Sequence, residues 1–109
     1  MPDFDDLFKE LKAGVIFLAE STLKNYVSRA KQDGNKMLND MKEKLKRWTQ
    51  LLIERKLTTE DFEWLVNSQK DLIQMAALKQ AGLAAIRIDQ FKASLLNMVV
   101  DTVFSFAKI

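Results

Sequence analysis

The sequence contains no cysteine and no histidine. Without cysteine the chain cannot form a disulfide, a thiolate metal site or a thiol nucleophile, and without histidine it lacks the commonest general base and the commonest zinc ligand. It also has no glycine-rich phosphate loop and no serine in a glycine-flanked nucleophile elbow. We therefore expect a protein that is not an enzyme, with no catalytic residue, no cofactor, no metal and no small-molecule substrate.

Glycine and proline are scarce, with three glycines and one proline among 109 residues. A chain with so few turn-forming residues has few reversals, so its helices or strands should be long. The length suits one domain, which we place at residues 1–109. Apolar residues make up 48% of the chain and charged residues 29%, a balance that favours a folded core over disorder.

No segment approaches the ~20 consecutive apolar residues that span a bilayer. The first ten residues, MPDFDDLFKE, are acidic, whereas a secretory signal peptide begins with positive charge. We therefore expect a cytoplasmic location.

The clearest boundary between two elements lies in ERKLTTEDFEWL, residues 54–65. Two basic residues suit the end of one helix, and Thr58 suits the N-cap of the next, where acidic residues follow in the first turn. Because so few residues separate the two helices, they must lie antiparallel as neighbours. Trp48 and Trp64 flank this turn, and we expect them to pack near each other.

Two glycines mark other candidate breaks, but the apolar pattern continues through both. In KQDGNK, residues 31–36, apolar side chains keep a spacing of three or four across Gly34, as they would in one unbroken helix. The same holds around Gly82, and a lone glycine costs a helix only about 1 kcal/mol. The pattern therefore favours helices that run through both positions.

These observations predict an all-α protein built as a long antiparallel αα-hairpin. Its helices span about residues 4–56 and 59–107, with kinks allowed at Gly34 and Gly82, and each would be roughly 75 Å long at 1.5 Å per residue. We expect such hairpins to pack into an oligomeric helical bundle. The alternative is a monomeric four-helix up-down bundle, with breaks at residues 33–35 and near Gly82.

The oligomer is predicted because two segments carry more apolar residues than one helix face can hold. These are AGVIFLAE, residues 13–20, and the C-terminal segment that begins SLLNMVVDTVF at residue 94. They meet at the open end of the hairpin, where two helices alone would leave about half of their apolar surface in water. We therefore predict a homo-oligomer, a dimer or tetramer. In the four-helix alternative the same residues are core. The predicted interface residues are Phe8, Leu11, Val15, Phe17, Leu18, Leu95, Val99, Val103 and Phe106.

Basic residues concentrate in the middle of the chain, with ten basic and four acidic residues between Lys24 and Lys56. The densest run, KEKLKRWTQ at residues 42–50, has groups that bind phosphates, but it is more typical of a solvated helix face. A pI near 8.9 falls just short of the usual nucleic-acid-binding range, so nucleic acid is not favoured as a partner. Acidic pairs within residues 3–6 and 60–63 lie at predicted helix N-termini, where they offset the helix dipole.

The function that these features indicate is structural or interaction-based: a self-associating bundle that acts as a scaffold or accessory subunit, with an unidentified protein partner. Peripheral binding to a lipid or membrane surface is the alternative, because the helices are amphipathic with a wide apolar face. Met37 and Met41, with Leu38 and Leu45, are also candidates for a groove that takes a partner helix, although methionines more often fill gaps in a core.

Overall fold

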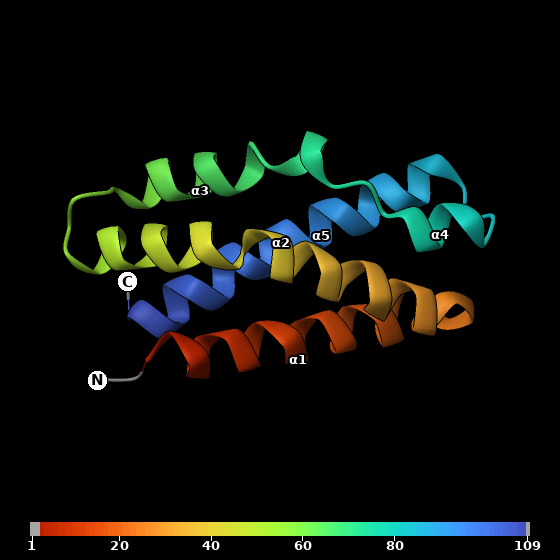
Figure 1. Ribbon diagram of the computed structural model, residues 1–109, viewed down its shortest axis with the longest axis horizontal. Helices are drawn as coiled ribbons and strands as arrows, with labels where there is room; N and C mark the ends of the chain where they lie inside the picture. Colours follow the sequence, from red (N-terminus) through yellow and green to blue (C-terminus); the bar gives the residue numbers. More distant parts are fainter. Residues whose placement is uncertain (1–2, 109) are drawn as a thin grey trace.

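The computed structural model describes residues 3–108, which form an antiparallel bundle (Figure 1). The chain runs along the bundle four times, and each of these passes is a leg. The first, second and fourth legs are single helices: α1 (Phe4–Thr22), α2 (Val27–Ile53) and α5 (Ala85–Ala107). The third leg is broken into α3 (Thr59–Asn67), the 3-10 turn η2 (Lys70–Leu72) and the short α4 (Ala76–Gln80). No strand occurs within residues 3–108. The prediction of an all-α helical bundle is confirmed.

Each leg packs on two neighbours, so that the four legs surround one core. Helix α1 packs on α2 and α5, and the third leg packs on the same two helices from the other side (Figure 1). Every leg contributes side chains to this core, among them the fully buried Leu11, Leu45, Phe62 and Leu95. Most of the apolar side chains of α1 and α5 are therefore covered within one chain, while Ile16, Phe17 and Ile86 stay exposed.

The predicted hairpin of two helices, each of about 50 residues, is wrong. Helices of that length would be roughly 75 Å long, whereas the bundle is 43 Å long and 23 × 19 Å across. The chain reverses at residues 23–26, 54–58 and 81–84 instead of once. The up-down arrangement of the four-helix alternative matches these reversals, but its first break was expected at residues 33–35.

The first reversal contains neither glycine nor proline. Leu23 ends α1 with φ −130° and turns its side chain into the core, and its carbonyl accepts a hydrogen bond from the Tyr26 amide at 2.8 Å within the 3-10 turn η1 (Lys24–Tyr26). Thr22 donates its hydroxyl to the Leu18 carbonyl at 2.6 Å, a local bond that competes with a continuing helix. The sequence signal of this turn is its cluster of Ser, Thr and Asn residues.

The turn predicted within residues 54–65 is confirmed. Helix α2 ends at Ile53, and Thr58 caps α3 by accepting a hydrogen bond from the Asp61 amide at 3.0 Å. Two acidic residues occupy the first turn of α3, where they offset the positive end of the helix dipole. Local capping chemistry is therefore enough to locate this reversal.

At two of the reversals the preceding helix is closed by a residue with positive φ. Gly82 (φ 88°) follows α4 and lets the Leu83 amide bond to the Leu78 carbonyl at 3.2 Å, and Arg55 (φ 61°) closes α2 in the same manner. Glycine is usual at this position because other L residues are strained at positive φ. One such residue followed by a short link is enough to reverse the chain, so the prediction of an unbroken helix through Gly82 is wrong.

We predict opposite effects on stability at these two positions. Arg55→Gly should raise the free energy of unfolding by about 1 kcal/mol, because glycine adopts positive φ without strain. Gly82→Ala should lower it by a similar amount; no heavy atom lies within 4 Å of an added Cβ, so the cost would come from the backbone alone. Urea denaturation measures both changes, and an unchanged midpoint in both variants would contradict these backbone conformations.

The other two glycines allow close helix contacts. A Cβ added to Gly34 would stand 2.5 Å from Val15 Cγ1 of α1, and one added to Gly14 would stand 2.5 Å from Met98 Sδ of α5. Helix α2 runs through Gly34 without a break, as the apolar pattern predicts. The glycine in KQDGNK therefore serves helix packing and not a turn.

We predict that Gly34→Ala lowers the free energy of unfolding by about 1–3 kcal/mol, because Val15 is stiff and fully buried and cannot move aside. This overpacking outweighs the gain of about 1 kcal/mol in helix propensity. Gly14→Ala should cost less, since the Met98 side chain is flexible. In a Val15→Ala background Gly34→Ala should become neutral or stabilising. An equal cost in both backgrounds, measured by urea denaturation, would rule out the close contact.

Candidate functional site: a methionine groove beside the broken leg

The third leg leaves its helical path between α3 and α4. After η2, Ile73 is extended (φ −89°, ψ 120°) and Met75 takes a left-handed conformation (φ 51°) before α4 begins. No glycine or proline occurs in residues 68–75. The prediction of one helix over residues 59–107 is wrong here, and the reason for the break lies outside the segment itself.

The side chain that secures the break is Asp33 of α2. Its Oδ1 accepts a hydrogen bond from the Ala77 amide at 3.0 Å, and its Oδ2 accepts one from the Leu78 amide at 2.8 Å. Asp33 is only 5% exposed, and Met75, which precedes α4, makes no side-chain capping bond. The first amides of a helix need acceptors, and a buried carboxylate needs donors. Asp33 therefore caps α4 from another leg of the bundle.

Beside this contact lies a groove of about 290 Å³ between α2 and the broken leg. Three of the five methionines in the chain line it, so we call it the methionine groove. Its lining residues are Asp33, Lys36, Met37, Asp40, Met41, Lys44, Gln69, Leu72, Ile73, Gln74, Met75 and Ala76. Met37 and Met41 are buried core residues that also line the floor of this groove, whereas Leu38 and Leu45 are fully buried and do not line it.

The charged groups that line the methionine groove already have partners. Lys36 Nζ lies 2.7 Å from Asp40 Oδ2, and Lys44 Nζ donates to Gln69 Oε1 at 3.0 Å. Both oxygens of Asp33 accept from α4. Each charged lining residue therefore has at least one partner within the chain, and the space between them suits an apolar group.

Two polar contacts hold the broken leg on α2 at either end of the methionine groove. Asp33 binds the start of α4, and Lys44 binds Gln69 beyond the end of α3. The two side chains are about 16 Å apart along α2 at 1.5 Å per residue. Between these contacts the leg contains η2 and extended residues but no α-helix, and the three methionines lie in this interval, Met75 on the leg and Met37 and Met41 on α2.

Leu72 stands at the rim of the methionine groove and is 68% exposed. Large apolar side chains are exposed at five other described positions: Ile16, Phe17, Ile53, Trp64 and Ile86. None of these five lines the groove. Leu72 is therefore the exposed apolar side chain that belongs to this site.

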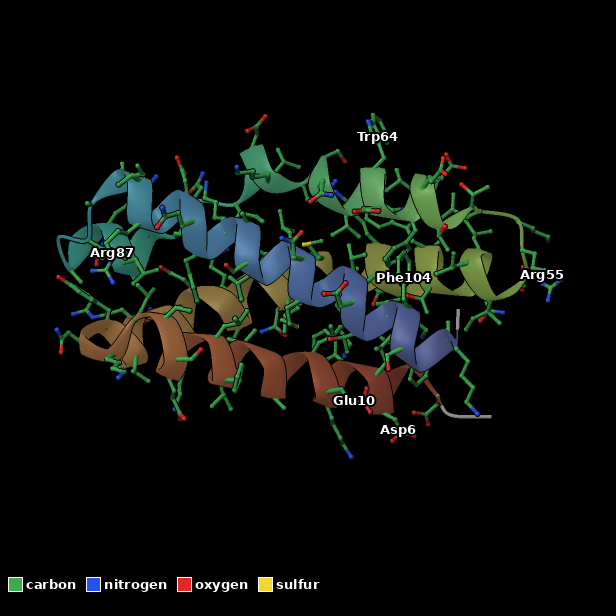
Figure 2. All side chains as sticks on the ribbon, turned by 180° about the vertical axis from the view of Figure 1, so that it is seen from behind. Asp6, Glu10, Arg55, Trp64, Arg87 and Phe104 are labelled. Carbon is green, nitrogen blue, oxygen red and sulfur yellow. The ribbon has the colours of Figure 1, made fainter. Side chains whose placement is uncertain are left out.

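Trp64 is 70% exposed and points away from the bundle (Figure 2). Helix α3 turns Phe62 and Val66 into the core, and Trp64 lies midway between them in sequence, on the opposite face. Trp48 is buried in the core. The prediction that the two tryptophans pack near each other is therefore wrong.

The predicted oligomer interface is largely the core of a single chain. Its buried members are Phe8, Leu11, Val15, Leu95, Val99 and Val103; Leu18 and Phe106 are partly buried against the core, and Phe17 is 69% exposed. The two strongly apolar segments do meet, as α1 packs on α5, but they meet within one chain. These residues act as core, as in the four-helix alternative, so self-association needs another surface.

The basic run at residues 42–50 does not form one charged face. Lys42 Nζ lies 5.0 Å from the ring centroid of Phe8 in α1, whereas Lys44 contacts Gln69 of the third leg. Trp48 is buried and cannot stack on a base or enter a headgroup layer. None of the helices within residues 3–108 combines the length and the apolar character needed to cross a membrane.

No protein-family model matches the chain, and comparisons with curated proteins and with solved structures return no significant match. The interpretation of the methionine groove therefore rests on its own geometry and chemistry.

We predict that Asp33→Asn lowers the free energy of unfolding by about 1–3 kcal/mol, because one amide oxygen replaces two acceptors and an NH₂ group is buried in place of the second. Asp40→Asn is the matched control. Asp40 is exposed and paired with Lys36, so its replacement should cost less than about 1 kcal/mol. Urea denaturation measures both. A loss at Asp33 no greater than that at Asp40 would contradict the capping role.

Proposed function

We propose that this chain is a non-enzymatic interaction protein, a scaffold or accessory subunit that binds an apolar side chain of a partner protein in the methionine groove. The observation that supports this most is the pairing of every charged group that lines the groove. A site for a polar substrate needs convergent polar groups that are free to orient it. The methionine groove instead offers an apolar floor.

The size of the methionine groove suits an apolar side chain. Pockets for small molecules usually measure about 300–1,000 Å³, and a cavity of about 150 Å³ holds a benzene ring. At about 290 Å³ the groove has room for one or two apolar side chains. Methionine suits this role because its unbranched thioether adapts to whatever packs against it.

The exposure of Leu72 is a second reason to expect a protein partner. Full burial of a leucine is worth about 1.5–3 kcal/mol, so a partner that covers this rim gains from Leu72 as well as from the groove. Contiguous exposed apolar surface marks sites of protein association, and Leu72 extends the apolar lining of the groove to the protein surface.

A leucine side chain on a capped backbone, N-acetyl-leucine methylamide, is a direct probe of this proposal. We predict that its addition shifts the NMR signals of the methionine methyl groups at Met37, Met41 and Met75 along one saturating curve. The methyl signal of Met98 should not move, because Met98 packs against Gly14 on the α1 side of the bundle. The absence of shifts, or equal shifts at Met98, would contradict binding in the groove.

A further inference from the structure

We infer that the apolar side chain that enters the methionine groove is Leu72 of a second copy of this chain. This inference rests on the proposed function and names its partner. Leu72 lies on the rim of the groove that it would fill in the other copy. A two-fold axis beside the rim places each Leu72 over the groove of its partner, because contacts across a two-fold interface are reciprocal.

Leu72 does not fill the groove of its own chain. The next residue, Ile73, is extended and partly buried against the core. Leu72 is the last residue of η2 and is 68% exposed, so its side chain lies in solvent while that of Ile73 packs against the core. The break in the third leg thus produces both an exposed leucine and a groove of suitable size, side by side.

The charge of this surface suits contact with an identical surface. The groove is lined by two lysines and two aspartates, so their charges cancel. Lys36 and Asp40 pair with each other at the exposed rim and can exchange partners across a two-fold axis, which keeps both charges satisfied.

The exposed surface around Trp64 does not suit a second copy. Trp64 lies on α3, which carries Glu60, Asp61 and Glu63 and no basic residue. Two such surfaces would repel each other, because like charges brought together across an interface are unfavourable. Electrostatics therefore favours the methionine groove over the Trp64 surface for contact with a second copy.

The contact predicted in this way is small and reversible. Standard protein interfaces bury about 800 Å² on each partner, and weak, transient ones bury less. An interface made of one groove, which holds one or two side chains, and its rim buries less than this and belongs with the weak, transient interfaces. Since a two-fold contact is closed, the product should be a dimer and not a fibre.

Sedimentation velocity over a concentration series tests this inference with two matched variants. Leu72→Glu removes the leucine, and Ile86→Glu makes the same change at a position that is also 68% exposed but lies on α5 away from the groove. The unmodified chain should shift from 12.6 kDa toward a dimer as concentration rises. Leu72→Glu should raise the dimer dissociation constant at least tenfold, whereas Ile86→Glu should leave it unchanged. Circular dichroism checks that both variants keep their helices.

A chain that stays monomeric, or a dimer that both variants weaken equally or neither weakens, overturns the inference. The titration with N-acetyl-leucine methylamide distinguishes failure of the second-copy inference from failure of the proposed function. If the amide binds at Met37, Met41 and Met75 while the chain stays monomeric, the groove serves a different protein and only the second-copy inference fails. If the amide does not bind, both fail.

Discussion

The shape of the third leg depends on two hydrogen bonds, from the Ala77 and Leu78 amides to the carboxylate of Asp33. Helix α4 has five residues, too few to be stable by itself, and the contact with Asp33 supplies the acceptors that its first amides require. Because this end of the leg is held by Asp33 and the other by Lys44, the residues between them, which form η2 and an extended link, lie over α2 and leave the groove between the leg and α2. The methionine groove is thus a consequence of helix capping between legs.

Features with a local physical cause could be predicted from the sequence. The cap at Thr58 is an example, because the capping bond spans three residues. The continuation of α2 through Gly34 is another, because apolar residues keep a spacing of three or four on both sides of Gly34, as one continuous helix requires. The reversal at Leu23 could not be predicted from that spacing, since Val15, Ala19 and Leu23 lie four residues apart, as they would in a helix that continued. The local features at this reversal are the Thr22 hydroxyl bond to Leu18 and the nearby Ser and Asn residues, and the reversal lets α2 and α5 pack on two sides of α1.

The candidate site was predictable only in part. Met37 and Met41 could be recognised as groove residues because they share one face of α2. Asp33 and Gly34 resemble turn residues in sequence, but one caps α4 and the other meets Val15 of α1. Both roles depend on partners distant in the chain, so no local pattern reveals them. The exposure of Leu72 could not be predicted from the sequence either, because it follows from the break in the third leg that Asp33 secures.

Amide hydrogen exchange at Ala77 and Leu78 tests the role of Asp33 most directly. The first turn of α5 provides an internal reference, since no side chain caps that helix and the Ile86 position is exposed. If Asp33 holds the start of α4 as described, the Ala77 and Leu78 amides should exchange much more slowly than the Ile86 amide. Exchange at Ala77 and Leu78 as fast as at Ile86 would show that the carboxylate does not hold α4, and the account of the groove would fail with it.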